Sequence, residues 1–95
     1  MNKEEFKQLL LSEKKKYISK SFEELISMKE PVTYEIEIRG QKCQVEVFIL
    51  ERNAQYVQVS VNIDDFKFPK VIMPLSESFV KYADGRVDIL NKNDS

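Results

Sequence analysis

Apolar and polar residues alternate along three stretches in the middle of the chain, 32–39, 42–50 and 56–64. The apolar positions are filled mainly by valine and isoleucine, which favour extended backbone and pack well on a pleated surface. A period of two indicates strands that bury one face and expose the other. Because short polar connections separate the stretches, residues 31–65 are predicted to form a three-stranded antiparallel meander.

The connection between the first two stretches predicts their register. Gly40-Gln41 is interpreted as a two-residue hairpin turn, because glycine readily takes the positive φ required at the first position. This turn pairs Ile38 with Cys43 and Val32 with Ile49, so that apolar residues meet on one face of the sheet. The opposite face is then mainly polar.

The second hairpin keeps one apolar face only if its loop contains an odd number of residues. We predict this loop at 52–54, which pairs Ile49 with Val57. In the same register, Leu50 lies opposite Tyr56 on the polar face of the sheet.

A helical pattern precedes the meander. Residues 2–29 are predicted to be helical, either as two helices with a kink near 19–21 or as one long bent helix. Each start carries a capping box, Asn2 with Glu5 and Ser21 with Glu24. The apolar face collects Phe6, Leu9, Leu10 and Tyr17, whereas Lys3, Lys7 and Lys14 are placed on the other faces.

The last third of the chain carries one strong turn signal. Asp84-Gly85 is typical of a two-residue hairpin turn, because both residues tolerate positive φ. It predicts a hairpin over 78–90, with Tyr82 opposite Val87. A short helix within 75–83 is the competing prediction.

These elements predict one α+β domain over residues 1–95. An N-terminal helix, or a kinked helix pair, packs on one face of the antiparallel β-meander of three strands, and a C-terminal β-hairpin follows. The prolines of 66–77 argue against a central strand, so this stretch is predicted to be an irregular connection. Residues 91–95 are expected to form a flexible tail.

Composition narrows the possible chemistry. The chain has no histidine, one cysteine and two glycines, which excludes a Cys/His zinc site and glycine-rich phosphate loops. Cys43 alternates with valines on the apolar face and is predicted to be a core residue. We therefore expect a non-enzymatic protein without a cofactor.

Charge and hydropathy bound the partners and the location. Fifteen basic residues against sixteen acidic ones leave a net charge of −1, which argues against nucleic acid as a partner. No apolar stretch reaches the ~20 residues of a membrane helix, and no signal peptide is recognisable. We expect a cytoplasmic protein that does not bind a membrane.

Apolar residues on the polar face are the leading site prediction. We expect a protein partner, or a second copy of the chain in a homodimer, to dock on Phe48, Leu50 and Tyr56 together with Phe66 and Phe68. The alternative is that the C-terminal segment folds over this patch and makes it core. By analogy with small α+β proteins, the predicted function is an interaction module of the inhibitor, immunity or adaptor type.

Three other clusters suggest further partners. The alternative site for phosphate or nucleic acid is the basic end of the first helix, Lys14, Lys15, Lys16, Tyr17 and Lys20. A metal-dependent enzyme that uses Asp64 and Asp65 is the remote alternative. Glu35, Glu37 and Glu46 form an acidic strip on the polar face, which suits a basic partner.

Overall fold

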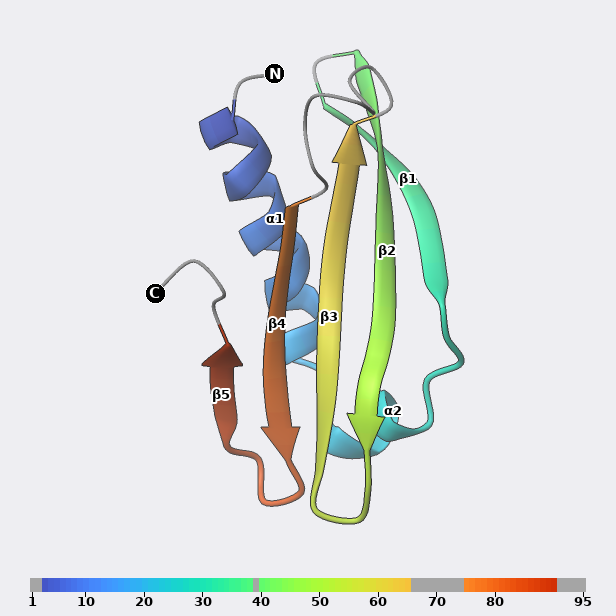
Figure 1. Cartoon of the computed structure of the whole chain (residues 1–95), viewed down its shortest axis with the longest axis vertical. Coiled ribbons are helices and arrows are strands. Elements are labelled where there is room, and N and C mark those ends of the chain that lie inside the picture. The colour runs from blue at the N-terminus through green and yellow to red at the C-terminus, as the bar shows by residue number, and fades with distance from the viewer. Residues whose placement is uncertain (1–2, 39, 66–74, 91–95) are drawn as a thin grey trace.

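The computed structural model describes residues 3–38, 40–65 and 75–90 and shows helices packed on one antiparallel sheet (Figure 1). The elements in chain order are α1 (Lys3–Ile18), α2 (Phe22–Ile26), β1 (Val32–Ile38), β2 (Gln41–Arg52), β3 (Tyr56–Asp65), β4 (Leu75–Tyr82) and β5 (Val87–Leu90). The strands are adjacent in chain order, β1-β2-β3-β4-β5, so the five-stranded sheet is a meander. The predicted α+β architecture is confirmed.

The helical region divides into two helices. Ser21 caps α2, because its hydroxyl accepts a hydrogen bond from the N–H of Glu24 (3.1 Å) and its own N–H donates to the Glu24 carboxylate (3.1 Å). This capping box satisfies N–H groups that have no partner within the helix. The predicted cap at Asn2 lies outside the described residues. Neither described helix has the length and hydropathy of a membrane span.

The core lies between the helices and the sheet. The helices cover the valine- and isoleucine-rich face, and α1 runs along β3 and β4 in the direction of β4 (Figure 1). Deep burial falls on alternate positions of β2 and β3, as the period of two predicts, whereas residues 77–80 of β4 are all buried. Among the described residues, the largest fully buried side chains are Leu10, Leu25, Cys43, Val45, Val47, Val57, Val59, Val61, Ile63 and Phe79.

The first hairpin keeps the predicted faces but not the predicted register. Ile38 pairs with Gln41 and not with Cys43. Gly40, with a φ of 78°, is therefore the second central residue of the turn rather than the first. Hairpin turns place positive φ at either position, and alternation alone does not distinguish the two. Because the slip is of two residues, the described side chains of both strands stay on their predicted faces.

A β-bulge alters the second hairpin. Ile49 pairs with Val59 and not with Val57, and the register shifts between Ile49 and Glu51. Leu50 is therefore the extra residue of the bulge, opposite no single partner. A bulge changes the pairing without changing the hydrophobic pattern, which is why alternation did not predict it.

Asn53 closes the loop of this hairpin. Its side-chain oxygen accepts hydrogen bonds from the N–H groups of Gln55 (2.8 Å) and Tyr56 (3.0 Å). Its own N–H donates to the carbonyl of Tyr56 (3.0 Å). Such side-chain bonds to nearby backbone make asparagine a common turn residue. The loop lies at 53–55, one residue later than predicted, and Arg52 ends β2.

Residues 75–82 form strand β4 and not the competing short helix. The strand pairs with β3 along its length, from Leu75 opposite Ile63 to Tyr82 opposite Tyr56. The predicted irregular connection over 66–77 therefore extends too far, because its last residues belong to β4. Residues 66–74 lie outside the described part of the chain.

The C-terminal hairpin is confirmed, with a register that differs from the prediction by one residue. Lys81, and not Tyr82, pairs with Val87. Gly85 has a φ of 97°, and its N–H donates to the carbonyl of Tyr82 (2.9 Å). The loop therefore has three residues, 83–85, instead of the predicted two, and ends with a glycine in the left-handed conformation, as is common in hairpin loops of this length. The Asp-Gly signal alone does not separate the two loop lengths.

Two lysines connect α1 to β4. Lys14 Nζ donates to Glu77 Oε1 (2.8 Å), and both side chains are buried. Lys81 Nζ donates to the main-chain carbonyl of Ile18 (3.0 Å) at the C-terminal end of α1, where a cation also suits the helix dipole. The prediction that Lys14 lies away from the buried side of the helix is wrong. Glu77 stands on the helix-covered side of β4 and supplies the partner that a buried ammonium group requires.

Candidate protein-binding surface

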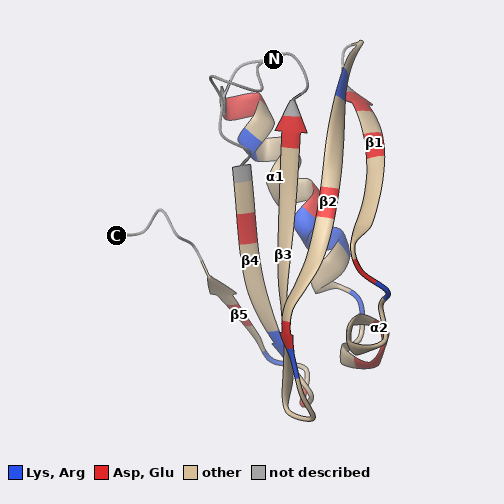
Figure 2. Cartoon of the chain, turned by 45° about the vertical axis from the view of Figure 1, so that its right-hand side comes forward, with Lys and Arg blue, Asp and Glu red and all other residues tan. Residues whose placement is uncertain are grey.

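One face of the sheet carries no helix. Both helices lie on the same side (Figure 1 and Figure 2), and no helix or strand of the described residues covers the other side, which we call the open face. The strand register assigns to it Thr33, Glu35, Glu37, Lys42, Gln44, Glu46, Phe48, Glu51, Tyr56, Gln58, Ser60, Asn62, Asp64, Ser76, Ser78, Val80, Tyr82, Asp88 and Leu90. Most of these side chains are polar, and a few are large and apolar.

The predicted aromatic surface is only partly assembled. Phe48 lies opposite Ser60 on β3, whereas Tyr56 lies at the other end of β3, opposite Tyr82. On this face of β3, Gln58 lies between Tyr56 and Ser60, the residue that Phe48 faces. Phe48 and Tyr56 therefore share the open face without forming one cluster.

Leu50 does not join this surface in the predicted way. It is the bulge residue and is 55% exposed. Its predicted position opposite Tyr56 is wrong, because the bulge removes it from pairing and Arg52 lies opposite Val57, so that Asn53 is the residue bonded to Tyr56. The two other predicted members, Phe66 and Phe68, lie outside the described residues.

Tyr56 and Tyr82 meet edge to face at the end of the open face. Their ring centroids are 6.1 Å apart, with an angle of 62° between the planes, a geometry that aromatic pairs favour. The Arg86 guanidinium lies over the Tyr82 ring, with Cζ 4.4 Å from its centroid, which is a cation–π contact. An open hollow of about 470 Å³, which we call the tyrosine hollow, is lined by Ala54, Gln55, Tyr56, Tyr82, Ala83, Asp84 and Arg86.

Hydrogen bonds hold the walls of the tyrosine hollow in place. The N–H of Ala83 donates to the carbonyl of Gln55 (2.9 Å) and joins the two hairpin loops. The main-chain N–H of Arg86 donates to Asp84 Oδ1 (3.0 Å), and its Nε donates to Asp84 Oδ2 (3.0 Å). These bonds lower the pKa of Asp84, so the carboxylate stays charged beside the guanidinium.

Tyr82 is fixed by a bond of its own. Its hydroxyl donates to Asp88 Oδ2 (2.9 Å), and this bond raises the pKa of Tyr82. The prediction from sequence included Tyr56 but missed Tyr82 and Arg86. Both residues flank the Asp84-Gly85 turn, and only the pairing of β3 with β4 brings them to Tyr56.

The residues of the alternative phosphate site have different surroundings. Lys14 and Tyr17 are buried. Lys16 is exposed but forms an ion pair with a glutamate one turn earlier in α1. Lys20 Nζ lies 5.9 Å from the centroid of the Tyr17 ring, and Lys15 is exposed. The structure therefore does not present these five residues as one basic surface.

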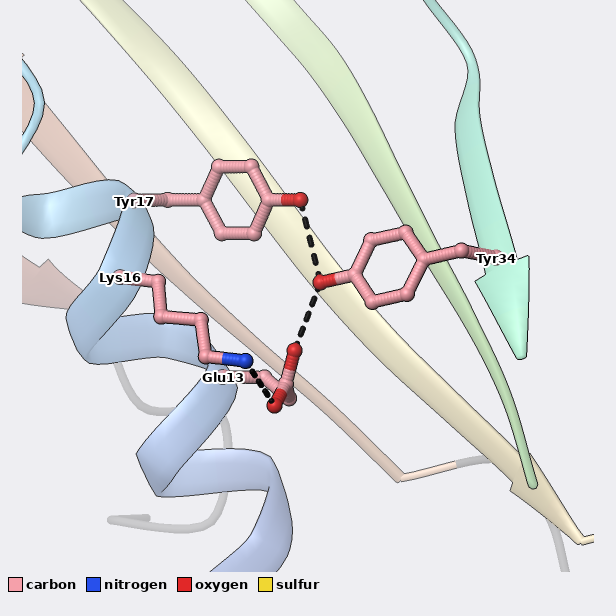
Figure 3. Close-up of polar contacts among 4 residues, drawn as sticks. All are labelled: Glu13, Lys16, Tyr17 and Tyr34. Carbon is pink, nitrogen blue, oxygen red and sulfur yellow. Dashed lines mark hydrogen bonds and ion pairs between the residues drawn. The ribbon is translucent and has the colours of Figure 1, made fainter. Parts of the chain in front are cut away.

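A chain of hydrogen bonds links the edge strand β1 to α1 (Figure 3). Tyr17 Oη donates to Tyr34 Oη (3.1 Å), and Tyr34 Oη donates to Glu13 Oε1 (2.6 Å). The other oxygen of Glu13 accepts from Lys16 Nζ (2.8 Å). Burial, followed by the bond to Glu13, raises the pKa of Tyr34. The Tyr34 hydroxyl therefore stays protonated and hydrogen-bonded, as expected for a contact that stabilises the fold.

Acidic side chains of the open face are spread over neighbouring strands. Asp64 pairs with Gln44, which in turn pairs with Glu35, and Glu46 lies in the next row. Within residues 3–38, 40–65 and 75–90, no three histidine, cysteine, aspartate or glutamate side chains are placed to hold a metal ion together. These carboxylates form a charged surface rather than a coordination shell.

Comparison with known proteins adds no relative. No protein-family model, curated protein or solved structure matches the chain. The function is therefore argued from the open face and from the tyrosine hollow at its end.

Proposed function

We propose that this protein is a small non-enzymatic interaction module of the inhibitor, immunity or adaptor type, which binds a protein through its open face. The observation that carries the proposal is the tyrosine hollow. Tyrosine and arginine are among the residue types that contribute most binding energy at protein interfaces. Tyr56, Tyr82 and Arg86 surround a space that can receive a side chain of a partner.

The order of the hollow before binding supports this function. Arg86 is held by Asp84 and by the face of Tyr82, and Tyr82 is held by Asp88. A side chain that must be immobilised on binding costs about 0.5–1.5 kcal/mol. Side chains that are already fixed avoid part of this cost.

The same bonds argue against proton transfer in the hollow. Hydrogen bonds from Arg86 lower the pKa of Asp84, and the bond to Asp88 raises the pKa of Tyr82. A general acid or base works best when its pKa lies near the working pH. Both shifts move away from that value, which favours an interaction surface over a catalytic one.

The partner is either a different protein or a second copy of the chain. Phe48 is half-buried on the open face, and Leu90 is 37% exposed there. Apolar residues near aromatic anchors exclude water from the centre of an interface. A homodimer through the open face is thus a second form of the same proposal, and the mass in solution distinguishes the two.

A photo-reactive residue in the hollow tests the proposal. Benzoylphenylalanine replaces Ala54, which is exposed and lines the hollow. In a matched control it replaces Ser12, which is exposed on α1. Irradiation in an extract of the native cell is expected to cross-link one protein, or a second copy of the chain, from position 54 and not from position 12.

The tyrosines are then removed to test their part in the cross-link. Tyr56→Ala with Tyr82→Ala is expected to abolish the cross-link from position 54 while the protein keeps a cooperative thermal transition. Cross-linking from both positions alike, or from neither, would contradict the proposal. Loss of the cooperative transition in the double variant would do the same, because the rings would then be core residues.

A further inference from the structure

We infer that the partner presents a positively charged segment, which the open face selects through carboxylates placed beside its apolar residues. The inference rests on the proposed function and specifies the partner of the same surface. It is carried by a contrast between the two sides of the sheet. Glu13, Glu30 and Glu77 on the helix-covered side are bound by cations of the chain, whereas carboxylates on the open face point to a cation supplied from outside.

Three carboxylates on the helix-covered side have cations of the chain as partners. Glu77 is bound by Lys14, and Glu30 is bound by Arg52. Glu13 likewise has a lysine partner in α1. Each acidic side chain named here lies within reach of a cation of the same chain, and the charges cancel locally.

The open face is different. Glu35, Glu46 and Asp64 form no ion pair with any residue of 3–38, 40–65 or 75–90. Glu35 and Asp64 stand in one row, on either side of Gln44, so their backbones are roughly 10 Å apart at a strand spacing of about 4.8 Å. A cation midway between the two positions lies roughly 5 Å from each, within the Debye length of about 8 Å. The three charges therefore act together on an approaching cation.

Basic residues of the described strands and helices lie mainly elsewhere. Lys42 is on the open face and Arg86 belongs to the tyrosine hollow, whereas Lys7, Lys15 and Lys16 are exposed on α1, on the other side of the sheet. Figure 2 shows acidic positions on β1, β2 and β3, and both acidic and basic positions on α1. The net charge of −1 thus conceals an acidic face, and such a face attracts a basic partner and repels an acidic one.

The geometry of the face also limits the form of the segment. Asp64 and Tyr56 stand at opposite ends of β3 on the same side, about 26 Å apart at ~3.3 Å per residue. An extended segment of about eight residues spans this distance. Its lysine or arginine residues lie at the acidic end, where they are far from the positive charge of Arg86. An aliphatic or aromatic side chain at its other end enters the tyrosine hollow. Phe48, between the two ends, provides an apolar contact for the middle of the segment.

Matched peptides of about ten residues, long enough for this span, test the inference by NMR of isotope-labelled protein. All carry a tyrosine at one end, and the other end carries lysine and arginine, or glutamate, or serine. We expect the basic peptide to shift amide signals of the open face and to leave those of α1 unchanged. Its affinity is expected to fall as the ionic strength rises, and the acidic peptide is expected not to bind.

Two double variants distinguish the effect of the open-face carboxylates on binding from the effect of the net charge of the protein. Glu46→Gln with Asp64→Asn removes two charges from the open face, and Glu4→Gln with Glu23→Gln removes two exposed charges from the helices. The first pair is expected to weaken binding of the basic peptide roughly fourfold to twenty-five-fold, at about twofold to fivefold for each carboxylate. The control pair is expected to weaken it less than about twofold.

The outcomes distinguish the inference from the function on which it rests. If the serine peptide binds as tightly as the basic one, the inference fails and the interaction module stands. The same holds if no peptide binds while the cross-link from position 54 forms. If no peptide binds and that cross-link is also absent, both fail. If the wild-type protein forms a dimer that protects the open face, a second copy of the chain occupies this face. That result would overturn the inference of a basic partner and leave the proposed function intact.

Discussion

Lys14 Nζ and Glu77 Oε1 lie 2.8 Å apart in the core, although 63 residues separate them in the chain. Both side chains are buried, so neither charge is solvated by bulk water. A buried charge without a partner costs several kcal/mol, which is more than the ion pair itself contributes. Each of the two residues is therefore tolerated in the core because the other is present.

Lys14→Met is expected to lower the free energy of unfolding by about 3–5 kcal/mol, because it leaves Glu77 buried without a cation. Lys14→Met with Glu77→Met is expected to recover most of this loss, since two apolar side chains fill a similar volume. Urea denaturation of the single and double variants gives the coupling energy. Lys15→Met, at the exposed neighbouring position, is the control and should cost less than about 0.5 kcal/mol. A double variant as unstable as Lys14→Met would rule out neutralisation of Glu77 as the role of Lys14.

Tyr34→Phe removes the hydroxyl that joins Tyr17 to Glu13. We expect it to lower the free energy of unfolding by about 1–3 kcal/mol, because buried polar groups lose their partner. Tyr82→Phe is the matched control, since its bond to Asp88 is exposed, and it should cost less than about 1 kcal/mol. Thermal denaturation of both variants measures the difference. Equal losses in the two would mean that the burial of the Tyr34 contact is unimportant.

Tyr34 also predicts how stability depends on alkaline pH. Its pKa is raised in the folded protein, chiefly by burial, whereas an unfolded tyrosine ionises near pH 10. Above about pH 10 the unfolded chain loses a proton that the folded chain retains, so stability falls as the pH rises. The stability advantage of wild type over Tyr34→Phe is complete below that pH and should shrink above it by up to about 1.4 kcal/mol per pH unit. Denaturation curves that stay parallel would contradict this assignment.

Gly85→Ala isolates the backbone conformation of the last hairpin. A Cβ at this position would meet no atom within 4 Å, and the φ of Gly85 is 97°. The expected loss of about 1–2 kcal/mol therefore comes from the left-handed conformation and not from a clash. Gly85→Asn should recover part of it, because asparagine adopts positive φ more readily than alanine. Thermal melts in which both variants lose the same stability would show that the backbone is not the cause.

Alternation of apolar and polar residues predicts the face on which a strand residue lies. The burial of Val45, Val47 and Val59 follows from it, and so does the location of the core. The register does not follow, because it depends on where Gly40 falls in its turn and on the bulge at Leu50. Neither feature alters the hydrophobic pattern, so the sequence carries no local signal for them.

The sequence predicts a residue of the candidate site only where that residue departs from the alternation of apolar and polar positions. Tyr56 is recognisable as an aromatic residue at a polar position of a strand. Tyr82 and Arg86 become part of the site through the pairing of β3 with β4, and no turn signal sets that register. The burial of Lys14 depends in the same way on Glu77, which a helical pattern cannot reveal.

The two lysine contacts of α1 also determine where the helix rests along the sheet. Apolar packing alone tolerates a slide by one helical turn, about 5.4 Å, because one aliphatic side chain then replaces another. Such a slide would bring Leu10 or Ile18 to the level of Glu77, and it would separate Lys81 from the carbonyl at the end of α1. Only one axial position satisfies both groups, so these contacts select a single arrangement of helix and sheet among several of similar hydrophobic burial.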